Sequence, residues 1–411
     1  MNTTAMKDHQ TGAPIELADR YGAHNYAPLP IVIERGEGPY VWDSEGNRYL
    51  DFLSCYSALS HGHRHPRIVA AMKRQLDRVT LTSRAFHNAE MGPFLQELCE
   101  YCDMDMALPM NTGAEAVETV LKAARKWAYR VKGVPRYEAE IIVCADNFHG
   151  RTITATSLST EESYRHDFGP FTPGFRIIPY GDIEALEATI TPNTAAFMLE
   201  PLQGEAGVRL APAGFLKAAR EMTQASNVLL VCDEIQTGLG RTGRRFCFDH
   251  EDVRPDLIAI GKSLGGGVYP VSAAVGTREV MDLFTPGEHG STFGGNPLAA
   301  AVGRESLRVL EEEDLAGRAA RLGEWLIGRL RAIDCPLVKE VRGQGLLIGV
   351  ELRPEAGGAR RYCEALMGEG LLCKETHDNV IRFAPALVVE QQELEAAMER
   401  VESVLTRMQP V

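Results

Sequence analysis

The chain has 411 residues, 45% of them hydrophobic, and its formal net charge is −13. This length is too great for one small core, so we expect at least two domains, one of them a large α/β unit. No basic run supplies the positive face that nucleic acid requires, and no segment approaches the roughly 20 apolar residues that cross a bilayer. Because residues 1–12 show neither a signal nor a transit pattern, the expected location is the cytoplasm, with no nucleic acid or membrane partner.

The first fifty or so residues read as a separate segment. They are extended and proline-rich around Pro28 and Pro30, and then hairpin-like over residues 40–52.

Two cysteines, Cys99 and Cys102, form a C-x-x-C in a run with helical character. The chain has nine cysteines, an odd number, and no second pair follows this one, which favours reduced thiols over disulfides or zinc.

The middle of the chain alternates strand and helix. Helical patterns cover residues 183–190 and 214–226. Short β-rich runs lie at 140–146, 176–180, 195–200, 228–234, 257–262 and 271–276. This alternation predicts a mostly parallel sheet covered on both faces, with ligands beyond the carboxyl ends of the strands.

After Asn296 the pattern changes to that of a smaller α+β domain. A long helical stretch is expected from Pro297 to about Ile333, then one strand over 341–352, a helix near 358–369 and a last helix over about 390–408.

Two glycine motifs suggest nucleotide binding, and both fail. Gly238-Leu-Gly240-Arg-Thr-Gly243 fits the dinucleotide pattern, but the residues after it lack the helical spacing that the pyrophosphate site needs. Gly261-Lys262-Ser263 resembles part of a P-loop, but Asp256 stands where the first glycine is required.

His61, His63 and His65 alternate as metal ligands on one strand face would, but no carboxylate or cysteine stands at ligand spacing. No metal is expected.

Lys262 and Asp233 each stand at the end of an apolar strand. A lysine held at the carboxyl edge of a sheet and partly desolvated can be neutral and form a Schiff base, although a plain surface lysine fits its position as well. A pyridoxal ring also needs an acidic partner at its nitrogen, and Asp233 fits that need better than a role in capping a turn does. Asn111-Thr112-Gly113-Ala114 opens a helix and could hold a phosphate, although a simple Thr N-cap explains this motif better when it is taken alone.

With these residues in view, the sequence resembles the class III aminotransferases of fold type I from about Tyr21 to the last helix. The resemblance is carried by the motifs YGAHNYAPLP, SCYSALSHGH, TLTSRAFHN, PMNTGAEAVET, NFHGRT, EPLQGEAGV, DEIQTGLGRTGR, GEHGSTFGGNP and IRFAPAL. It implies an α/β fold with a mostly parallel seven-stranded sheet in the large domain, and a smaller α+β domain from the C-terminal part and the N-terminal segment. The implied boundaries are 1–56 for the N-terminal segment, 57–304 for the large domain and 305–411 for the small domain.

The resemblance also implies pyridoxal 5′-phosphate as cofactor. Lys262 would hold it covalently, Asp233 would pair with the ring nitrogen, Gln236 would lie near the phenolic oxygen and Phe148 would stack on the ring. Thr112, Gly113 and Ala114 would form the phosphate site. Ser291 and Thr292 would reach the same phosphate from a partner subunit, so a homodimer with shared active sites is expected; assembly beyond the dimer is left open.

Within the family, the chain is most similar to members that act on the δ-amino group of L-ornithine with 2-oxoglutarate as acceptor. The implied substrate residues are Tyr26, Tyr56, Arg151, Glu205 and Arg382. By resemblance, Tyr26 and Arg151 hold the far carboxylate, and Glu205 pairs with Arg382 until 2-oxoglutarate arrives. One position departs: His149 stands where those members carry tryptophan.

Three alternative functions remain open at this point. The nearest is another ω-aminotransferase, acting on acetylornithine, 4-aminobutyrate, lysine or diaminobutyrate. An aminomutase or racemase on the same scaffold would need no 2-oxoglutarate. A non-catalytic binding protein would have no use for both Lys262 and Asp233.

Overall fold

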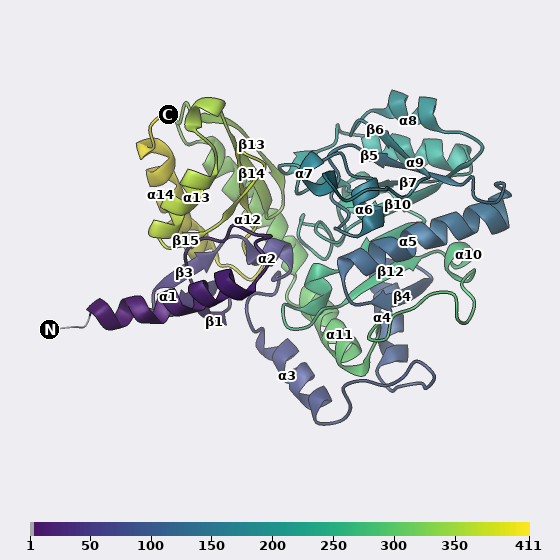
Figure 1. Cartoon of the computed structure of the whole chain (residues 1–411), viewed down its shortest axis with the longest axis horizontal. Coiled ribbons are helices and arrows are strands. Elements are labelled where there is room, and N and C mark those ends of the chain that lie inside the picture. Colours follow the sequence, from purple (N-terminus) through teal and green to yellow (C-terminus); the bar gives the residue numbers. More distant parts are fainter. Residues whose placement is uncertain (1–3) are drawn as a thin grey trace.

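The structure is a computed structural model, and it describes residues 4–411, with side chains from residue 12 onward. Its larger part is built on a seven-stranded sheet (Figure 1). In spatial order the strands are β4 (Met106–Met110), β12 (Ser272–Gly276), β11 (Leu257–Ile260), β10 (Leu229–Asp233), β7 (Thr194–Leu199), β5 (Glu140–Cys144) and β6 (Phe175–Ile178). β12 runs antiparallel to both neighbours, and the other printed pairings in the sheet are parallel.

Each central strand is apolar on both faces because helices cover both. In β10, Leu230 and Cys232 face one core, while Leu229 and Val231 face the other. α5 (Gly113–Trp127) packs on the second face. The first face is covered by α3 (Pro66–Leu76), α4 (Met91–Cys102), α8 (Ile183–Thr189), α9 (Phe215–Ala225) and α11 (Pro297–Glu312). Burial on both sides explains why these strands read as continuous apolar runs.

The second part joins both ends of the chain. Its four-stranded antiparallel sheet is β13 (Val338–Gln344), β14 (Leu347–Leu352), β17 (Val380–Phe383) and β16 (Lys374–Thr376), packed with α12 (Leu315–Arg331), α13 (Arg360–Gly368) and α14 (Gln391–Arg407). A separate sheet pairs β1 (Ile33–Glu37), β2 (Tyr40–Asp43) and β3 (Arg48–Asp51) with β15 (Leu371–Leu372). The N-terminal segment therefore packs with the C-terminal part. The boundaries proposed above, near 56 and 304, stay a prediction.

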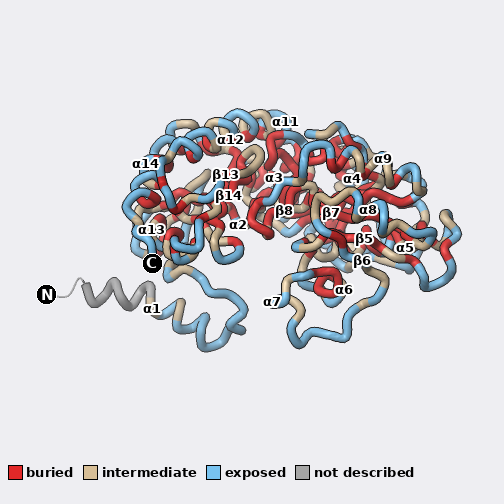
Figure 2. Tube along the Cα trace, turned by 90° about the horizontal axis from the view of Figure 1, so that it is seen from above, coloured by how far each residue is buried: buried red, intermediate tan, exposed pale blue. Residues whose placement is uncertain are grey.

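Several shorter elements complete the chain. They are α2 (Ser54–Ser57), α6 (Ile153–Ser157), α7 (Glu162–Arg165), α10 (Arg278–Met281), β8 (Leu202–Gln203) and β9 (Arg209–Leu210). At the N-terminus, α1 (Thr4–Tyr21) extends away from the two cores, at the periphery of Figures 1 and 2. No helix among the described residues combines the length and apolar character that crossing a membrane requires.

Four sequence predictions need correction. The strand expected over 341–352 is a hairpin, because Gly345 turns the chain with φ +55°. The single helix expected over 297–333 is two helices, interrupted at Asp314, whose φ is +47° and whose carboxylate caps α12 by accepting a bond from Gly317 N at 3.2 Å. Residues 4–21 are helical where an extended segment was expected, and the short strand β4 was missed.

Candidate active site

The carboxyl ends of five strands converge on one cavity of about 220 Å³. It lies where β4, β5, β7, β10 and β11 end, the sheet edge at which the sequence predicted ligands. Its lining residues are Gly113, Ala114, Phe148, His149, Gly150, Glu200, Glu205, Asp233, Ile235, Gln236, Thr237 and Lys262.

One end of the cavity is the N-terminus of α5. Thr112 is the N-cap: its Oγ1 accepts a bond from Glu115 N at 3.3 Å, and Glu115 Oε2 accepts one from Thr112 N at 2.8 Å. These reciprocal bonds fix the first turn, so the helix dipole and the backbone around Gly113 and Ala114 present a positive site to an anion. A side chain at Gly113 would crowd Ile235, since a Cβ there would lie 3.1 Å from that residue.

Asp233 is buried at the end of β10 and hydrogen-bonded on both oxygens. Oδ1 accepts a bond from Ile235 N at 3.1 Å, and Oδ2 lies 2.7 Å from His149 Nδ1. Because an ionised carboxylate only accepts, His149 Nδ1 carries the hydrogen of this bond. Burial opposes a charge on His149, but the Asp233 carboxylate outweighs burial and raises the pKa of the imidazole. His149 thereby holds Asp233 in one orientation.

A second buried carboxyl, Glu200, follows β7 beside this pair. Its Oε2 accepts a bond from Phe148 N at 3.0 Å. Burial raises the pKa of Glu200 to about 8, a shift that His149 opposes and Asp233 reinforces. At neutral pH Glu200 is therefore mostly protonated.

Lys262 follows β11 and faces the cavity. Its backbone has φ +44°, a left-handed conformation that costs free energy for a non-glycine residue. Burial lowers the pKa of the amine, while Glu205 and Asp233 oppose that shift. A lowered pKa makes the neutral, nucleophilic amine accessible.

A second pocket of about 590 Å³ shares Phe148, Glu205 and Lys262 with this cavity. It adds Asn25, Tyr26, Ala27, Tyr56, Arg151, Glu161, Ser163, Tyr164, Lys374, Glu375, Thr376, His377, Asp378 and Arg382. All five residues expected to bind substrate therefore line one pocket. Because the two pockets share Lys262, a molecule in the second would meet the amine directly.

Glu205 and Arg382 form an ion pair at 2.5 Å, and the Arg382 side chain is 1% exposed. Burial disfavours the charge on Glu205, yet Arg382 and Lys262 hold the pKa of this carboxyl below its ordinary value. Gln236 Nε2 donates to the same carboxylate at 3.1 Å. The Arg382 guanidinium also lies 5.3 Å from the Tyr56 ring centre. A buried arginine is thus neutralised by a carboxylate that remains partly exposed.

Three expected cofactor residues are not among the lining residues: Thr112, which is the N-cap of α5, and also Ser291 and Thr292. Ser291 and Thr292 lie in the loop before α11, where Asn111 Nδ2 donates to Ser291 Oγ at 2.7 Å. The geometry of a single chain leaves their expected role untested.

The rejected motifs have other roles in the structure. His61, His63 and His65 lie in the connection between α2 and α3, where His63 forms an isolated β-bridge with Gly38. They contact Ser306, Asp51 and Glu313 respectively. No cluster of three or more potential metal ligands is found in residues 4–411. The glycine motif leads into a turn and a short 3-10 helix over Cys247–Glu251, and in the described part of the chain no α-helix follows it directly.

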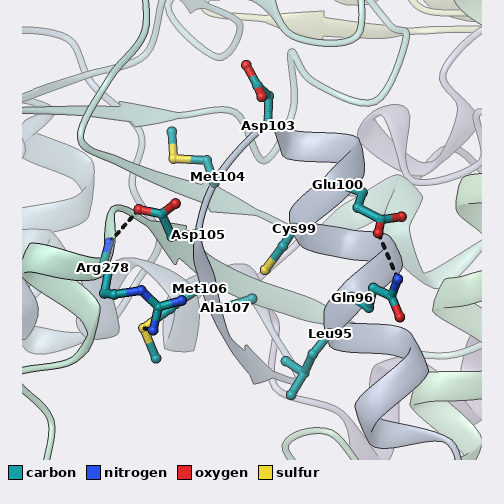
Figure 3. Close-up of a pocket in the computed structure, with 10 residues that line it drawn as sticks. All are labelled: Leu95, Gln96, Cys99, Glu100, Asp103, Met104, Asp105, Met106, Ala107 and Arg278. Carbon is teal, nitrogen blue, oxygen red and sulfur yellow. Dashed lines mark hydrogen bonds between the residues drawn. The ribbon is translucent and has the colours of Figure 1, made fainter.

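Another cavity lies away from these two pockets. Figure 3 shows this cavity of about 760 Å³ between α4 and the start of β4, with Arg278 N donating to Asp105 Oδ2 at 2.8 Å. It lies at the amino end of β4, the end opposite Gly113, and no expected site residue lines it. In sheets of this kind the amino edge is not the ligand edge.

Sequence reasoning missed three residues of the site: Glu200, Tyr164 and the role of His149 as partner of Asp233. His149 was noticed only as an unusual residue after Phe148. Glu200 ends an apolar strand just as Asp233 does, so the same signal could have found it. Tyr164 lies on α7, and nothing in its local pattern marks it.

Comparisons with known proteins agree with this geometry. Residues 21–405 match the family described as aminotransferase class-III. The chain is 58% identical to an ornithine aminotransferase of Bacillus anthracis over 397 residues, 97% of this chain and 100% of that protein. The crystal structure of an ornithine aminotransferase of Toxoplasma gondii, with partial occupancy of PLP at its active site, is 47% identical and superposes with a TM-score of 0.96 over 99% of this chain and 98% of that one. An acetylornithine aminotransferase of Elizabethkingia anophelis is 44% identical, with a TM-score of 0.88 over 96% and 99%.

Proposed function

Because the chain belongs to the class-III aminotransferases, we propose that it transfers the δ-amino group of L-ornithine to 2-oxoglutarate. The products are glutamate 5-semialdehyde, which cyclises to pyrroline-5-carboxylate, and glutamate. The observation that carries this proposal is the pocket beside Lys262, which holds one arginine paired with a carboxylate and a second arginine without one.

The cofactor is pyridoxal 5′-phosphate, and the residues of the first cavity fit it. The N-terminus of α5 suits its phosphate, the buried Asp233 suits its ring nitrogen, and Lys262 suits its carbonyl carbon. Phe148 lines the same cavity and offers a ring face. Gln236 Oε1 is buried without a hydrogen-bond partner among the described residues, which leaves a polar group of the cavity wall unsatisfied.

Bound pyridoxal phosphate supplies an electron sink for the carbanion formed next to the substrate nitrogen. Lys262 lies where the two pockets meet, and the lowered pKa of its amine suits it to hold the cofactor and then to accept the proton from the substrate carbon. Asp233, fixed by His149 and Ile235 N, keeps a proton at the ring nitrogen. The protonated Glu200 adds no second negative charge beside it at neutral pH.

The amine donor must present its δ-amine to Lys262 and its α-carboxylate at the far end. Four cationic side chains line the substrate pocket. Lys374 is paired with Glu375, Arg382 is paired with Glu205, and Lys262 is the reacting amine. Among the described residues no ion pair of Arg151 is found, so its guanidinium is free to bind a carboxylate bidentately.

The acceptor places different demands on the same pocket. 2-Oxoglutarate carries a carboxylate beside its carbonyl and another at the far end. Ornithine bound through its δ-amine has no carboxylate near the reacting carbon, so an unpaired Arg382 would be a desolvated cation. Glu205 neutralises Arg382 in the ornithine half, and on its partly exposed side chain it can move away when the acceptor's carboxylate arrives.

Two further parts of the proposal concern assembly and location. We infer a homodimer in which Ser291 and Thr292 of the partner subunit reach the cofactor phosphate, which would explain why these residues do not line their own cavity. Large apolar side chains are exposed on α3, on the loop after it and beside Thr292: Leu76, Val79, Leu81, Phe86 and Phe293. A cytoplasmic location accords with nine cysteines that are all free.

An amine-donor panel tests the proposed function. The purified enzyme with bound cofactor is mixed with ornithine, acetylornithine, 4-aminobutyrate, lysine or diaminobutyrate, and glutamate formation from 2-oxoglutarate is measured. Ornithine should give the highest kcat/KM. A higher value for another donor would replace ornithine, and turnover of an amino acid without 2-oxoglutarate would indicate an isomerase.

A further inference from the structure

The guanidinium of Arg151 must be held in place if it is to bind a substrate carboxylate. A flexible guanidinium with no carboxylate partner would sample many positions, and ordering it at each binding event costs conformational entropy. A carboxylate that held it permanently would compete with the substrate for the same donors. Something that orders Arg151 without neutralising it would serve a binding site best.

Tyr164 meets this requirement. Its ring lies against the Arg151 guanidinium, whose central carbon is 3.7 Å from the ring centre. Tyr164 projects from the short helix α7 and lines the substrate pocket together with Arg151. Its ring packs edge-on against Phe148 with the ring centres 5.9 Å apart, and Phe148 in turn lines the cofactor cavity.

The Tyr164 hydroxyl remains neutral in this setting. Burial raises the pKa of Tyr164, and the positive charge of Arg151 only opposes part of that rise. The ring therefore offers Arg151 the negative face of its π system with no formal charge. The planar edge of the guanidinium, which carries the N–H donors, stays available to a carboxylate.

We propose that Tyr164 is a positioning residue that stacks on Arg151 and holds its guanidinium ready for the far carboxylate of both substrates. The inference rests on the proposed function, because it assigns the far carboxylate to Arg151. It adds a residue on α7 to the specificity pocket and explains how that pocket keeps one cation ordered and unpaired. Tyr164 acts through Arg151, so its loss should weaken carboxylate binding and leave the reaction at Lys262 largely intact.

The test uses glutarate, a dicarboxylate of the same length as 2-oxoglutarate that cannot react. Its dissociation constant is measured by calorimetry on the cofactor-loaded enzyme and on the variants Tyr164→Leu and Tyr164→Phe. Tyr164→Leu should weaken binding roughly 2- to 5-fold, the range expected for loss of a cation–π contact at an exposed arginine. Tyr164→Phe keeps the ring and should stay within about 2-fold of the parent enzyme.

A matched control removes a similar contact nearby. The Arg165 guanidinium carbon lies 4.1 Å from the Phe171 ring centre, and neither residue lines the substrate pocket. Phe171→Leu should leave the glutarate dissociation constant unchanged. The melting temperature and visible spectrum of each variant show whether it folds and holds its cofactor.

A double-mutant cycle separates positioning from packing. In an Arg151→Gln background, Tyr164→Leu should weaken glutarate binding less than 2-fold, because there is no guanidinium left to position. The same loss in both backgrounds, or equal losses for Tyr164→Phe and Tyr164→Leu, would overturn the inference. A parent enzyme that binds no glutarate would overturn it as well, whereas one that binds glutarate but does not use ornithine would overturn only the proposed donor.

Discussion

Asp233 and Glu234 are adjacent buried acids with different surroundings. Asp233 lines the cofactor cavity, while Glu234 does not; it accepts bonds from Thr237 and Phe248, and burial raises its pKa to about 8. Asp233→Asn removes the charge that keeps the ring nitrogen protonated. We expect kcat to fall by roughly 10³-fold or more, as for loss of a major electrostatic stabiliser of a transition state. Glu234→Gln, which resembles the protonated acid, should lose much less; a loss of only a few-fold in Asp233→Asn would make Asp233 a turn residue.

Glu200 gives a prediction about pH. Burial raises the pKa of its carboxyl from an ordinary 4.5 to about 8. A group whose pKa is raised in the folded state contributes stability that is fully present below the unfolded pKa and is lost as the pH rises through the folded pKa. Glu200→Gln cannot ionise. The melting temperature of the variant relative to the parent should therefore rise from about pH 5 to pH 8 and then level off, and a constant difference across this range would contradict the assignment.

At the residue scale, the sequence predicted strand-end residues that line one cavity in the structure. Lys262 and Asp233 were found because a charged residue that ends an apolar strand is unusual. The bond from His149 to Asp233 joins two strand ends 84 positions apart, and the stack of Tyr164 on Arg151 depends on how α7 folds back. Such contacts are set by packing, and no local pattern in the sequence records them.

At the scale of elements, the hairpin of β13 and β14 joins the two parts of the molecule. Arg241, fully buried in the glycine motif, donates to the carbonyls of Leu346 at 3.0 Å and Pro385 at 2.6 Å. Gly349 of β14 pairs with Arg382 of β17. The motif that resembled a dinucleotide site is therefore a docking loop, and the hairpin that it holds pairs with β17, the strand that contains Arg382.

Gly345 tests this docking. Its φ is +55°, and a Cβ there would lie 2.4 Å from the backbone of Thr242. Gly345→Ala should destabilise the protein by on the order of 2 kcal/mol or more, because the atoms that the new Cβ would meet are backbone atoms. Backbone atoms cannot move aside as the end of a flexible side chain can. Gly328→Ala in α12 is the control: a Cβ there meets nothing within 4 Å, and it should stabilise by about 0.5–1 kcal/mol. Urea unfolding measures both; equal effects would show that the close approach is unimportant.

Element prediction succeeded where burial is uniform and failed at breaks. The central strands β7, β10 and β11 read as apolar runs because both faces are covered. The interruption between α11 and α12 depends on Asp314, which adopts a left-handed backbone conformation. Aspartate tolerates this conformation, but its presence in a sequence does not predict it. The turn at Gly345 follows Gly343 and Gln344, a local turn signal that the single-strand prediction overlooked. β4, with five residues and a proline, was too short to stand out.

At the scale of the whole molecule, the proposed active site needs two chains. Lys262→Ala should fold and lose turnover, because nucleophile and proton acceptor are one group. Ser291→Ala combined with Thr292→Val should weaken cofactor binding. Mixing the two variants under conditions that exchange subunits should restore activity, since one site of each hybrid combines an intact Lys262 with an intact loop from its partner. Sedimentation shows whether hybrids form, and hybrids without restored activity would contradict the shared site.

In the proposed function, one pocket serves two substrates of different charge because Glu205 shields Arg382 from the donor and releases it to the acceptor. The most direct measurement is rapid mixing of the cofactor-loaded enzyme with ornithine, and separately of its aminated form with 2-oxoglutarate, following cofactor absorbance. In Glu205→Ala the ornithine half should weaken by about 2–4 kcal/mol, the range for breaking a buried charged pair, while the half with 2-oxoglutarate and glutamate should persist or improve. Glu161→Gln, another glutamate of the pocket that forms no ion pair with Arg382, should leave this balance unchanged. Equal losses in both halves of Glu205→Ala, or no loss in either, would contradict the account.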